Sequence, residues 1–144
     1  MADKKILTVN GRDVEFTNER NLLEVIRKAG IDLPTFCYHS ELSIYGACRL
    51  CLVNVKGQNG RPDMIMAACS TAPQSGMVLQ TETKEIRDMR KIAIELLLAN
   101  HDLECPSCVR SENCKLQTIA RQLGVSKIRY KKLEKFAPLD DFSP

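Results

Sequence analysis

Cysteine is the residue type in this sequence most able to do chemistry. The chain has 144 residues and contains seven cysteines but no tryptophan. The first residues lack the apolar stretch of a secretory leader, so disulfide pairing in an oxidising compartment is a poor explanation for so many thiols. An odd number of cysteines in an intracellular chain of this size instead indicates metal binding.

The first group of thiols has the spacing C-x10-C-x2-C-x17-C and consists of Cys37, Cys48, Cys51 and Cys69. The close pair, Cys48 and Cys51, allows two thiolates to reach the same metal centre, and the small Gly46 lets the main chain come close to it. Four thiolates suit either tetrahedral zinc or an iron–sulfur cluster. Zinc sites usually show two close pairs, whereas one close pair with two outlying cysteines is nearer to a [2Fe–2S] site of the plant-ferredoxin kind. The spacing therefore favours [2Fe–2S], with zinc or unliganded thiols as the alternatives.

The second group has the spacing H-x3-C-x2-C-x5-C and consists of His101, Cys105, Cys108 and Cys114. Three thiolates and one imidazole are a known zinc set, and they also suit a [4Fe–4S] cluster with one ligand that is not cysteine. A histidine at the end of a helix has a simpler explanation, which is a favourable interaction with the helix dipole. The seven cysteines and His101 nevertheless fill two four-ligand sites with none left over, which supports ligation.

The elements that position the first group form a small mixed sheet with one helix across it. Strands are expected at residues 5–9, 12–16, 52–55, 64–68 and 77–81. Asn10-Gly11 is a typical type I′ turn between the first two strands. Thr17 or Asn18 is expected to cap a helix that ends at Gly30. A loop over residues 33–51 then carries three of the four cysteines.

The composition changes near residue 81, and we expect a domain boundary there, with domains at 1–80 and 81–144. Residues 83–100 lack glycine and proline and favour a helix. Its apolar residues extend beyond one face, so this helix is expected to be buried on several sides. A cysteine-rich turn and a short helix over 114–123 follow, and a basic tail from Lys127 to Lys135 could meet an acidic partner or simply be solvated.

Two motifs carry a resemblance to known families. The segments TFCYH (35–39) and GACRLC (46–51) resemble the N-terminal ferredoxin domain of [FeFe]-hydrogenases and of the large iron–sulfur subunit of respiratory complex I. The segment HDLECPSC (101–108), continued to Cys114, resembles the [4Fe–4S] segment with one histidine and three cysteine ligands that follows in both. The similarity runs in order over about residues 5–125. The gap before Cys69 looks a few residues longer than is usual in these families.

The resemblance implies an α+β chain, in which a β-grasp, plant-ferredoxin-like [2Fe–2S] domain precedes a small helical [4Fe–4S] module. The first cluster would be held by Cys37, Cys48, Cys51 and Cys69, and the second by His101, Cys105, Cys108 and Cys114. The implied function is electron transfer within a soluble multi-subunit NAD(P)(H)-linked oxidoreductase of the cytoplasm, with the hydrogenase and electron-bifurcating types as the candidates. The implied partners are a flavin- and NAD(P)(H)-binding subunit and other iron–sulfur subunits.

Several function classes fit the sequence poorly. The net charge of +3 is too small to indicate nucleic-acid binding, and no apolar run is long enough for a membrane span. No catalytic residue, nucleophile–base pair or phosphate-binding loop is evident. Three alternatives remain: an N-terminal piece of a longer hydrogenase or dehydrogenase, a zinc-stapled interaction module, and a redox or oxygen sensor. The initial methionine and the basic tail favour a complete subunit over a piece.

Overall fold

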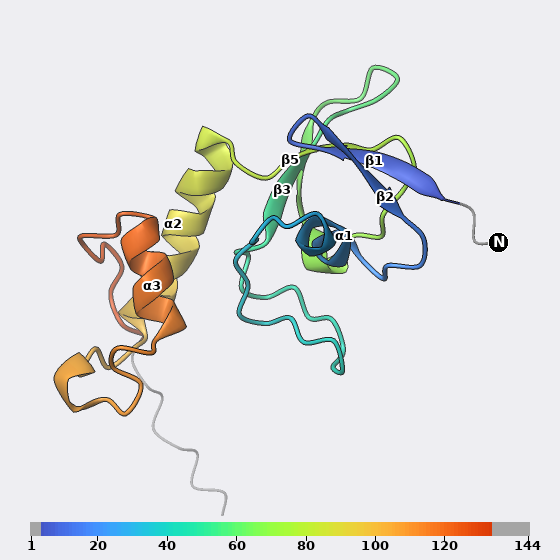
Figure 1. The fold of residues 1–144 in the computed structure, drawn as a ribbon. Helices are drawn as coiled ribbons and strands as arrows, with labels where there is room; N and C mark the ends of the chain where they lie inside the picture. The colour runs from blue at the N-terminus through green and yellow to red at the C-terminus, as the bar shows by residue number, and fades with distance from the viewer. Residues whose placement is uncertain (1–3, 134–144) are drawn as a thin grey trace, which may run out of the picture. The chain divides into compact units, whose positions relative to one another are not determined.

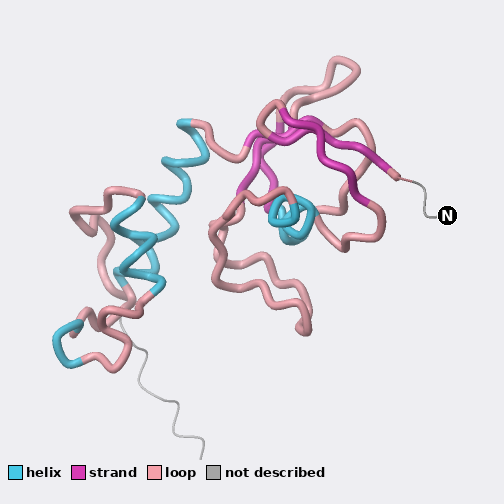
Figure 2. The backbone as a smooth tube through the Cα atoms, viewed as in Figure 1, coloured by secondary structure: helices cyan, strands magenta, loops and turns pink. Residues whose placement is uncertain are grey.

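The computed structural model describes residues 4–133, which form one five-stranded sheet, three α-helices and two short 3-10 helices (Figures 1 and 2). The strands are β1 (Lys5–Val9), β2 (Arg12–Phe16), β3 (Leu52–Val55), β4 (Met64–Ala67) and β5 (Val78–Gln80). The helices are α1 (Leu22–Lys28), α2 (Lys84–Ala99) and α3 (Lys115–Gln122), with 3-10 turns η1 (Ala68–Ser70) and η2 (Cys105–Ser107). The predicted α+β class is confirmed. The chain divides into two compact units between Ala93 and Ile94, within α2.

The sheet is mixed, with strand order β2-β1-β5-β3-β4. Two antiparallel hairpins, β1 with β2 and β3 with β4, are joined by β5, which pairs parallel to β1 and antiparallel to β3. The predicted Asn10-Gly11 turn is confirmed, since both residues have the positive φ angles, 51° and 81°, that a type I′ turn requires. The last strand in the sequence of this unit therefore occupies the centre of the sheet.

The core of the first unit lies between the sheet and α1, which crosses one face of the sheet (Figure 1). Helix α1 contributes Leu22, Leu23, Val25 and Ile26, each fully buried. Apolar side chains from the strands meet this face, among them Leu7, Val9, Phe16, Leu52, Val53 and Leu79. The two cysteines nearest to the second hairpin, Cys51 and Cys69, belong to the same cluster of buried side chains. The packed core is thus continuous with the first group of thiols.

Helix α1 begins later than the sequence suggested. The N-cap is Asn21, whose Oδ1 accepts the Glu24 N–H at 3.0 Å, and not Thr17 or Asn18. The Glu24 carboxylate completes the cap by accepting the Arg20 N–H at 2.8 Å. All of these candidates are good capping residues, so local preference does not choose among them. Tertiary burial distinguishes them, because Asn21 is only 1% exposed, whereas Thr17 and Asn18 are exposed.

Helix α2 is less enclosed than predicted. The side chains of Met89, Ile92, Leu96 and Leu97 are each 39% to 45% exposed, so the expectation that the helix is buried on several sides is wrong. The buried positions include two charged residues, Arg90 and Glu95. Each finds an ionic partner, Glu82 at 2.7 Å for Arg90 and Arg129 at 2.7 Å for Glu95. None of the helices within residues 4–133 is both long and apolar enough to span a membrane.

The second unit has α3 and an irregular segment that follows it. Helix α3 ends where predicted, with Gly124 at a φ angle of 65°. Two basic residues of the tail form ion pairs within the unit, Arg129 with the buried Glu95 and Lys132 with Asp102 at 2.7 Å. The tail up to residue 133 is thus tied to the unit in part and is not a free basic helix, whereas Lys135 lies outside the described residues.

The N-cap assignment leads to a test by substitution. Asn21→Ala removes the acceptor for the Glu24 N–H, and we expect it to lower the free energy of unfolding by about 1 kcal/mol. Asn18→Ala is the matched control, since Asn18 is exposed and precedes the helix, and it should change stability little. Urea unfolding of the full chain, followed by far-UV circular dichroism, measures both. Equal effects of the two substitutions would contradict the assignment.

Candidate metal centres

The second hairpin brings Cys51 and Cys69 together. Cys51 directly precedes β3, and Cys69 lies in η1, directly after β4. Because β3 and β4 are antiparallel with Leu52 opposite Ala67, the residues just beyond this pair meet at the same end of the hairpin. The Ala68 N–H donates to the Cys51 carbonyl at 2.9 Å, which ties η1 to the residue before β3. Both cysteine side chains are 1% exposed.

The loop before β3 brings Cys37 and Cys48 together as a second pair. Their Sγ atoms are 3.4 Å apart, and both residues are half-buried. The loop turns tightly here, since Gly46 and Arg49 have positive φ angles of 67° and 53°. A side chain at Gly46 would meet only ordinary contacts, with Ser70 Oγ at 3.7 Å, so glycine is needed for the backbone angle and not for close approach.

Backbone amides point at the sulfur atoms of this second pair. The Phe36 N–H donates to Cys48 Sγ and the Cys48 N–H donates to Cys37 Sγ, each at 3.5 Å. Burial acts to raise the pKa of the Cys48 thiol, but the amides of Phe36 and Leu50 outweigh it and lower that pKa to about 7. At Cys69, burial and the neighbouring Cys51 thiol raise the pKa to about 12. Cys48 thus favours the thiolate more than an ordinary cysteine does, while Cys69 in the metal-free protein favours the thiol.

Helix α1 fastens the loop beside Cys37. The Tyr38 hydroxyl donates to Glu24 Oε1 at 2.5 Å, and the Arg27 guanidinium lies over the Tyr38 ring at 5.9 Å. Farther along, Arg20 Nη1 donates to the Ser40 carbonyl at 2.7 Å. His39, in the same loop, is exposed, and its Nδ1 accepts the Glu41 N–H at 3.2 Å within a turn. The N-terminal half of the loop is therefore positioned by a buried helix.

The donor set of the first unit fits a cluster of two metal ions. Cys37 and Cys48 are in contact, and Cys51 and Cys69 lie at the same end of the second hairpin. A [2Fe–2S] centre takes four protein ligands shared between two irons. Within the described residues, no three histidine, cysteine or acidic side chains are placed to share one metal ion. A single tetrahedral zinc needs four donors around one point, whereas the thiols here are arranged as two pairs.

The four donors of the second group lie in one continuous segment between α2 and α3. His101 follows the end of α2 and its N–H donates to the Leu98 carbonyl at 3.1 Å. Cys105 begins η2, and the Cys108 N–H closes that turn on the Cys105 carbonyl at 3.3 Å. Cys114 is the N-cap of α3. The Arg110 N–H donates to Cys108 Sγ at 3.4 Å, so an amide faces sulfur here as in the first unit.

The donors of the second group are more exposed to solvent than those of the first group. Cys108 and His101 are exposed, and Cys105 and Cys114 are half-buried. Within residues 4–133, no three of these side chains are placed to share one metal ion, and a hollow of about 630 Å³ lies beside Cys114. Its lining includes Arg110, Asn113 and Lys115. Of the four donors, only Cys114 lines this hollow. Three soft thiolates and one imidazole are a donor set that suits an iron–sulfur cluster.

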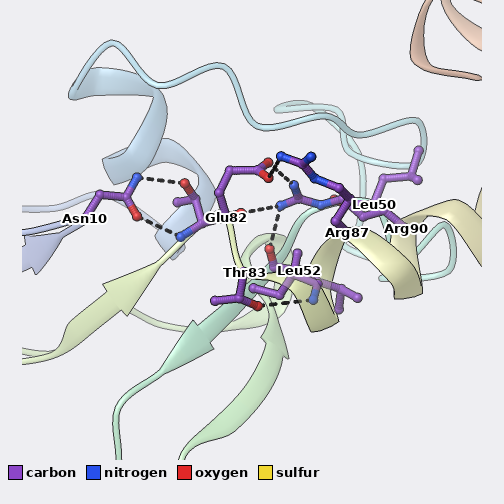
Figure 3. Close-up of polar contacts among 9 residues, drawn as sticks. Asn10, Leu50, Leu52, Glu82, Thr83, Arg87 and Arg90 are labelled. Atoms are coloured by element: carbon purple, nitrogen blue, oxygen red, sulfur yellow. Dashed lines mark hydrogen bonds and ion pairs between the residues drawn. The ribbon is translucent and has the colours of Figure 1, made fainter. Parts of the chain in front are cut away.

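Arg90 is the residue near the first group that the sequence analysis missed. Its guanidinium donates to the carbonyls of Leu50 and Leu52, the two neighbours of Cys51, at 2.8 Å each (Figure 3). A signal was present, because Arg90 lies four residues after Ile86 and four before Ile94, both fully buried. An arginine in register with the buried stripe of a helix indicates that its charge has an internal partner.

Two family models match the chain. The model for the 2Fe-2S iron–sulfur cluster binding domain matches residues 4–84, more than half of the chain. The model for the iron–sulfur binding region of NADH-ubiquinone oxidoreductase G matches residues 90–129. The two matched segments contain the first and the second donor group, respectively. The predicted cofactors, a [2Fe–2S] and a [4Fe–4S] cluster, are confirmed.

Relatives are found among large oxidoreductase subunits. The mitochondrial 78 kDa subunit of NADH-ubiquinone oxidoreductase from Candida albicans is 36% identical over 86% of this chain. The alpha subunit of NADPH-Fe(3+) oxidoreductase from Geobacter sulfurreducens is also 36% identical over 86% of this chain. The chain spans only 17% and 14% of these two proteins.

A solved structure has the same arrangement of elements. An NAD+-reducing [NiFe]-hydrogenase in the H2-reduced state matches with a TM-score of 0.79 and 26% identity, over 92% of this chain and 54% of that one. The resemblance to the N-terminal iron–sulfur region of complex I and of hydrogenases is thus confirmed. On these grounds the chain belongs to the family of 2Fe-2S iron–sulfur cluster binding domains, and an iron–sulfur binding region of the NADH-ubiquinone oxidoreductase G type follows that domain.

Proposed function

We propose that this chain transfers single electrons within a multi-subunit NAD(P)(H)-linked oxidoreductase, between a flavoprotein partner and other redox centres. The observation that carries the proposal is the gathering of four thiols in two pairs beside a packed core, with backbone amides directed at the sulfur atoms of one pair. When bound, the two clusters supply one-electron oxidation and reduction with little change in geometry. The relatives named above, NADH- and NADPH-linked oxidoreductase subunits, support the class of complex.

In this proposal, the segment 1–80 holds the [2Fe–2S] cluster and the segment 81–144 holds the [4Fe–4S] cluster. The ligands of the first are Cys37, Cys48, Cys51 and Cys69. The ligands of the second are His101, Cys105, Cys108 and Cys114. The protein contributes rigid backbone at the first site, where the loop is tied to α1 and to the second hairpin. At the second site it contributes donors placed at a helix end, a 3-10 turn and an N-cap.

The proposed setting is the cytoplasm, within a complex that also contains a flavin- and NAD(P)(H)-binding subunit and further iron–sulfur subunits. Support comes from the seven free cysteines, which a reducing compartment preserves. The short coverage of the relatives favours a second possibility of the same class, in which these residues act as the N-terminal part of a longer oxidoreductase. Both possibilities require the same two clusters, so the tests below apply to either.

Iron analysis tests the assignment of the second ligand set. The anaerobically prepared chain should contain about six iron and six sulfide. Cys105→Ala should lose about four of each and retain the visible circular dichroism of the [2Fe–2S] site, since the two donor sets use separate residues. Ser107→Ala, between Cys105 and Cys108, is the matched control and should keep both clusters. Full iron content in Cys105→Ala would overturn the assignment.

The imidazole ligand makes a separate prediction. His101→Cys replaces a neutral donor by a thiolate, which adds negative charge and should lower the reduction potential of the [4Fe–4S] site. His39→Ala changes the only other histidine of the chain and should leave that potential unchanged. Titrations followed by electron paramagnetic resonance measure both. An unchanged potential in His101→Cys would show that His101 is not a ligand.

The proposed electron-transfer role predicts that NADPH reduces the clusters only when a flavoprotein is present. NADPH alone should not bleach the visible absorbance of the anaerobic chain, since hydride donors need a flavin to deliver single electrons. Adding a catalytic amount of a ferredoxin–NADP+ reductase-type flavoprotein should bleach it, and subsequent addition of oxidised cytochrome c should restore it. Bleaching by NADPH alone, or none with the flavoprotein while dithionite still bleaches, would contradict the proposal.

A further inference from the structure

Arg90 is the only basic residue that is buried among residues 4–133, and its side chain is 2% exposed. It lies in the first half of α2 and belongs to the first unit. Burial lowers the pKa of the guanidinium, but arginine is not deprotonated in proteins, so the charge persists. A buried cation is costly unless it is paired and hydrogen-bonded, which directs attention to its partners.

The partners of Arg90 surround Cys51. The Nε atom donates to the Leu50 carbonyl and Nη2 donates to the Leu52 carbonyl, each at 2.8 Å. Nη2 also donates to the Thr81 carbonyl at 3.0 Å. One planar group thus holds the peptide on both sides of Cys51 and ties it to the segment that follows β5. Because a guanidinium has a fixed fork geometry, the three carbonyls are held in one arrangement.

The charge of Arg90 is only partly balanced. Its Nη1 atom forms an ion pair with Glu82 Oε1 at 2.7 Å, but the Glu82 side chain is 56% exposed. Water therefore screens the carboxylate far more than the guanidinium. The Cys51 thiol, at 1% exposed, shares the buried environment of the cation. A positive charge in this position lowers the free energy of a negative charge that is added near Cys51.

We propose that Arg90 is a positioning residue for the [2Fe–2S] site, which fixes the backbone around Cys51 and whose charge raises the reduction potential of that site. The proposal rests on the ligation by Cys51 proposed above. Reduction adds one negative charge to the site, and a nearby unscreened cation stabilises the reduced form relative to the oxidised one. Positioning acts through the Leu50 and Leu52 carbonyls, and the effect on potential acts through charge.

The experiment separates the two roles with four variants of the full chain, prepared anaerobically. Arg90→Gln removes the charge, and Arg90→Lys retains it with fewer hydrogen bonds. Glu82→Gln removes the balancing carboxylate and leaves Arg90 in place. Arg87→Gln is the matched control, because Arg87 also contacts Glu82, at 3.5 Å, but is 66% exposed. The readouts are iron content, visible circular dichroism and the potential of the [2Fe–2S] site.

We expect Arg90→Gln to disfavour reduction at least tenfold, which for a one-electron couple is about 59 mV toward negative potential. Arg90→Lys should shift less, Glu82→Gln should shift the potential upward, and Arg87→Gln should leave it unchanged. A changed circular dichroism spectrum in Arg90→Lys at nearly unchanged potential would support the positioning role. Unchanged potential and spectrum in an iron-replete Arg90→Gln would overturn the proposal.

Loss of the cluster also gives a decisive result. Selective loss of the [2Fe–2S] signal in Arg90→Gln, with the [4Fe–4S] signal retained, supports positioning, and Glu82→Gln then decides the effect of charge. An unchanged potential in Glu82→Gln would overturn that part. Cys51→Ala distinguishes failure of the underlying ligation, since a retained [2Fe–2S] site in that variant refutes the ligand set itself. Electron transfer from the flavoprotein is measured separately and does not depend on the outcome for Arg90.

Discussion

Four sulfur atoms can be held close together only if the backbone that carries them is fixed by other interactions. Thiolates repel one another, and burial raises the free energy of each charged form. In this protein the antiparallel pairing of β3 with β4 places Cys51 and Cys69 side by side, and amides directed at Cys37 and Cys48 offset part of the cost at the other pair. The sheet, the loop and α1 together hold the four cysteines in these positions.

The two units differ in the packing that supports their donor groups. The first has a continuous core in which two of its cysteines take part. The second buries few apolar side chains among the described residues, chiefly Ile94, Ala99 and Ile119. A unit of this size rarely reaches stability from such a core alone, and small units of this kind usually depend on metal binding for part of their folding free energy. The ion pair of Arg129 with the buried Glu95 adds a contact between the tail and α2.

Local patterns predicted much of this fold, and tertiary contacts decided the rest. The Asn10-Gly11 turn and the cysteine spacings depend on nearby residues, so the hairpins and the first gathering of thiols could be anticipated. The start of α1 could not, because Asn18 and Asn21 are equivalent capping residues until burial distinguishes them. The buried Arg90 was missed because hydrophobic periodicity counts an arginine as a solvent-facing residue, whereas the carbonyls that bind it come from residues 38 and 40 positions earlier.

The central position of β5 has a consequence for synthesis. The side chains of Asn10 and Thr81 are joined across 71 positions, with Asn10 Nδ2 donating to Thr81 Oγ1 at 2.8 Å and the Thr81 N–H donating back to Asn10 Oδ1 at 2.9 Å. Long-range pairing of this kind forms late. On the ribosome, the N-terminal hairpin and α1 emerge well before the strand that must lie between the two hairpins. Until the middle of the sheet closes, the core that buries Cys51 and Cys69 is therefore incomplete in the nascent polypeptide.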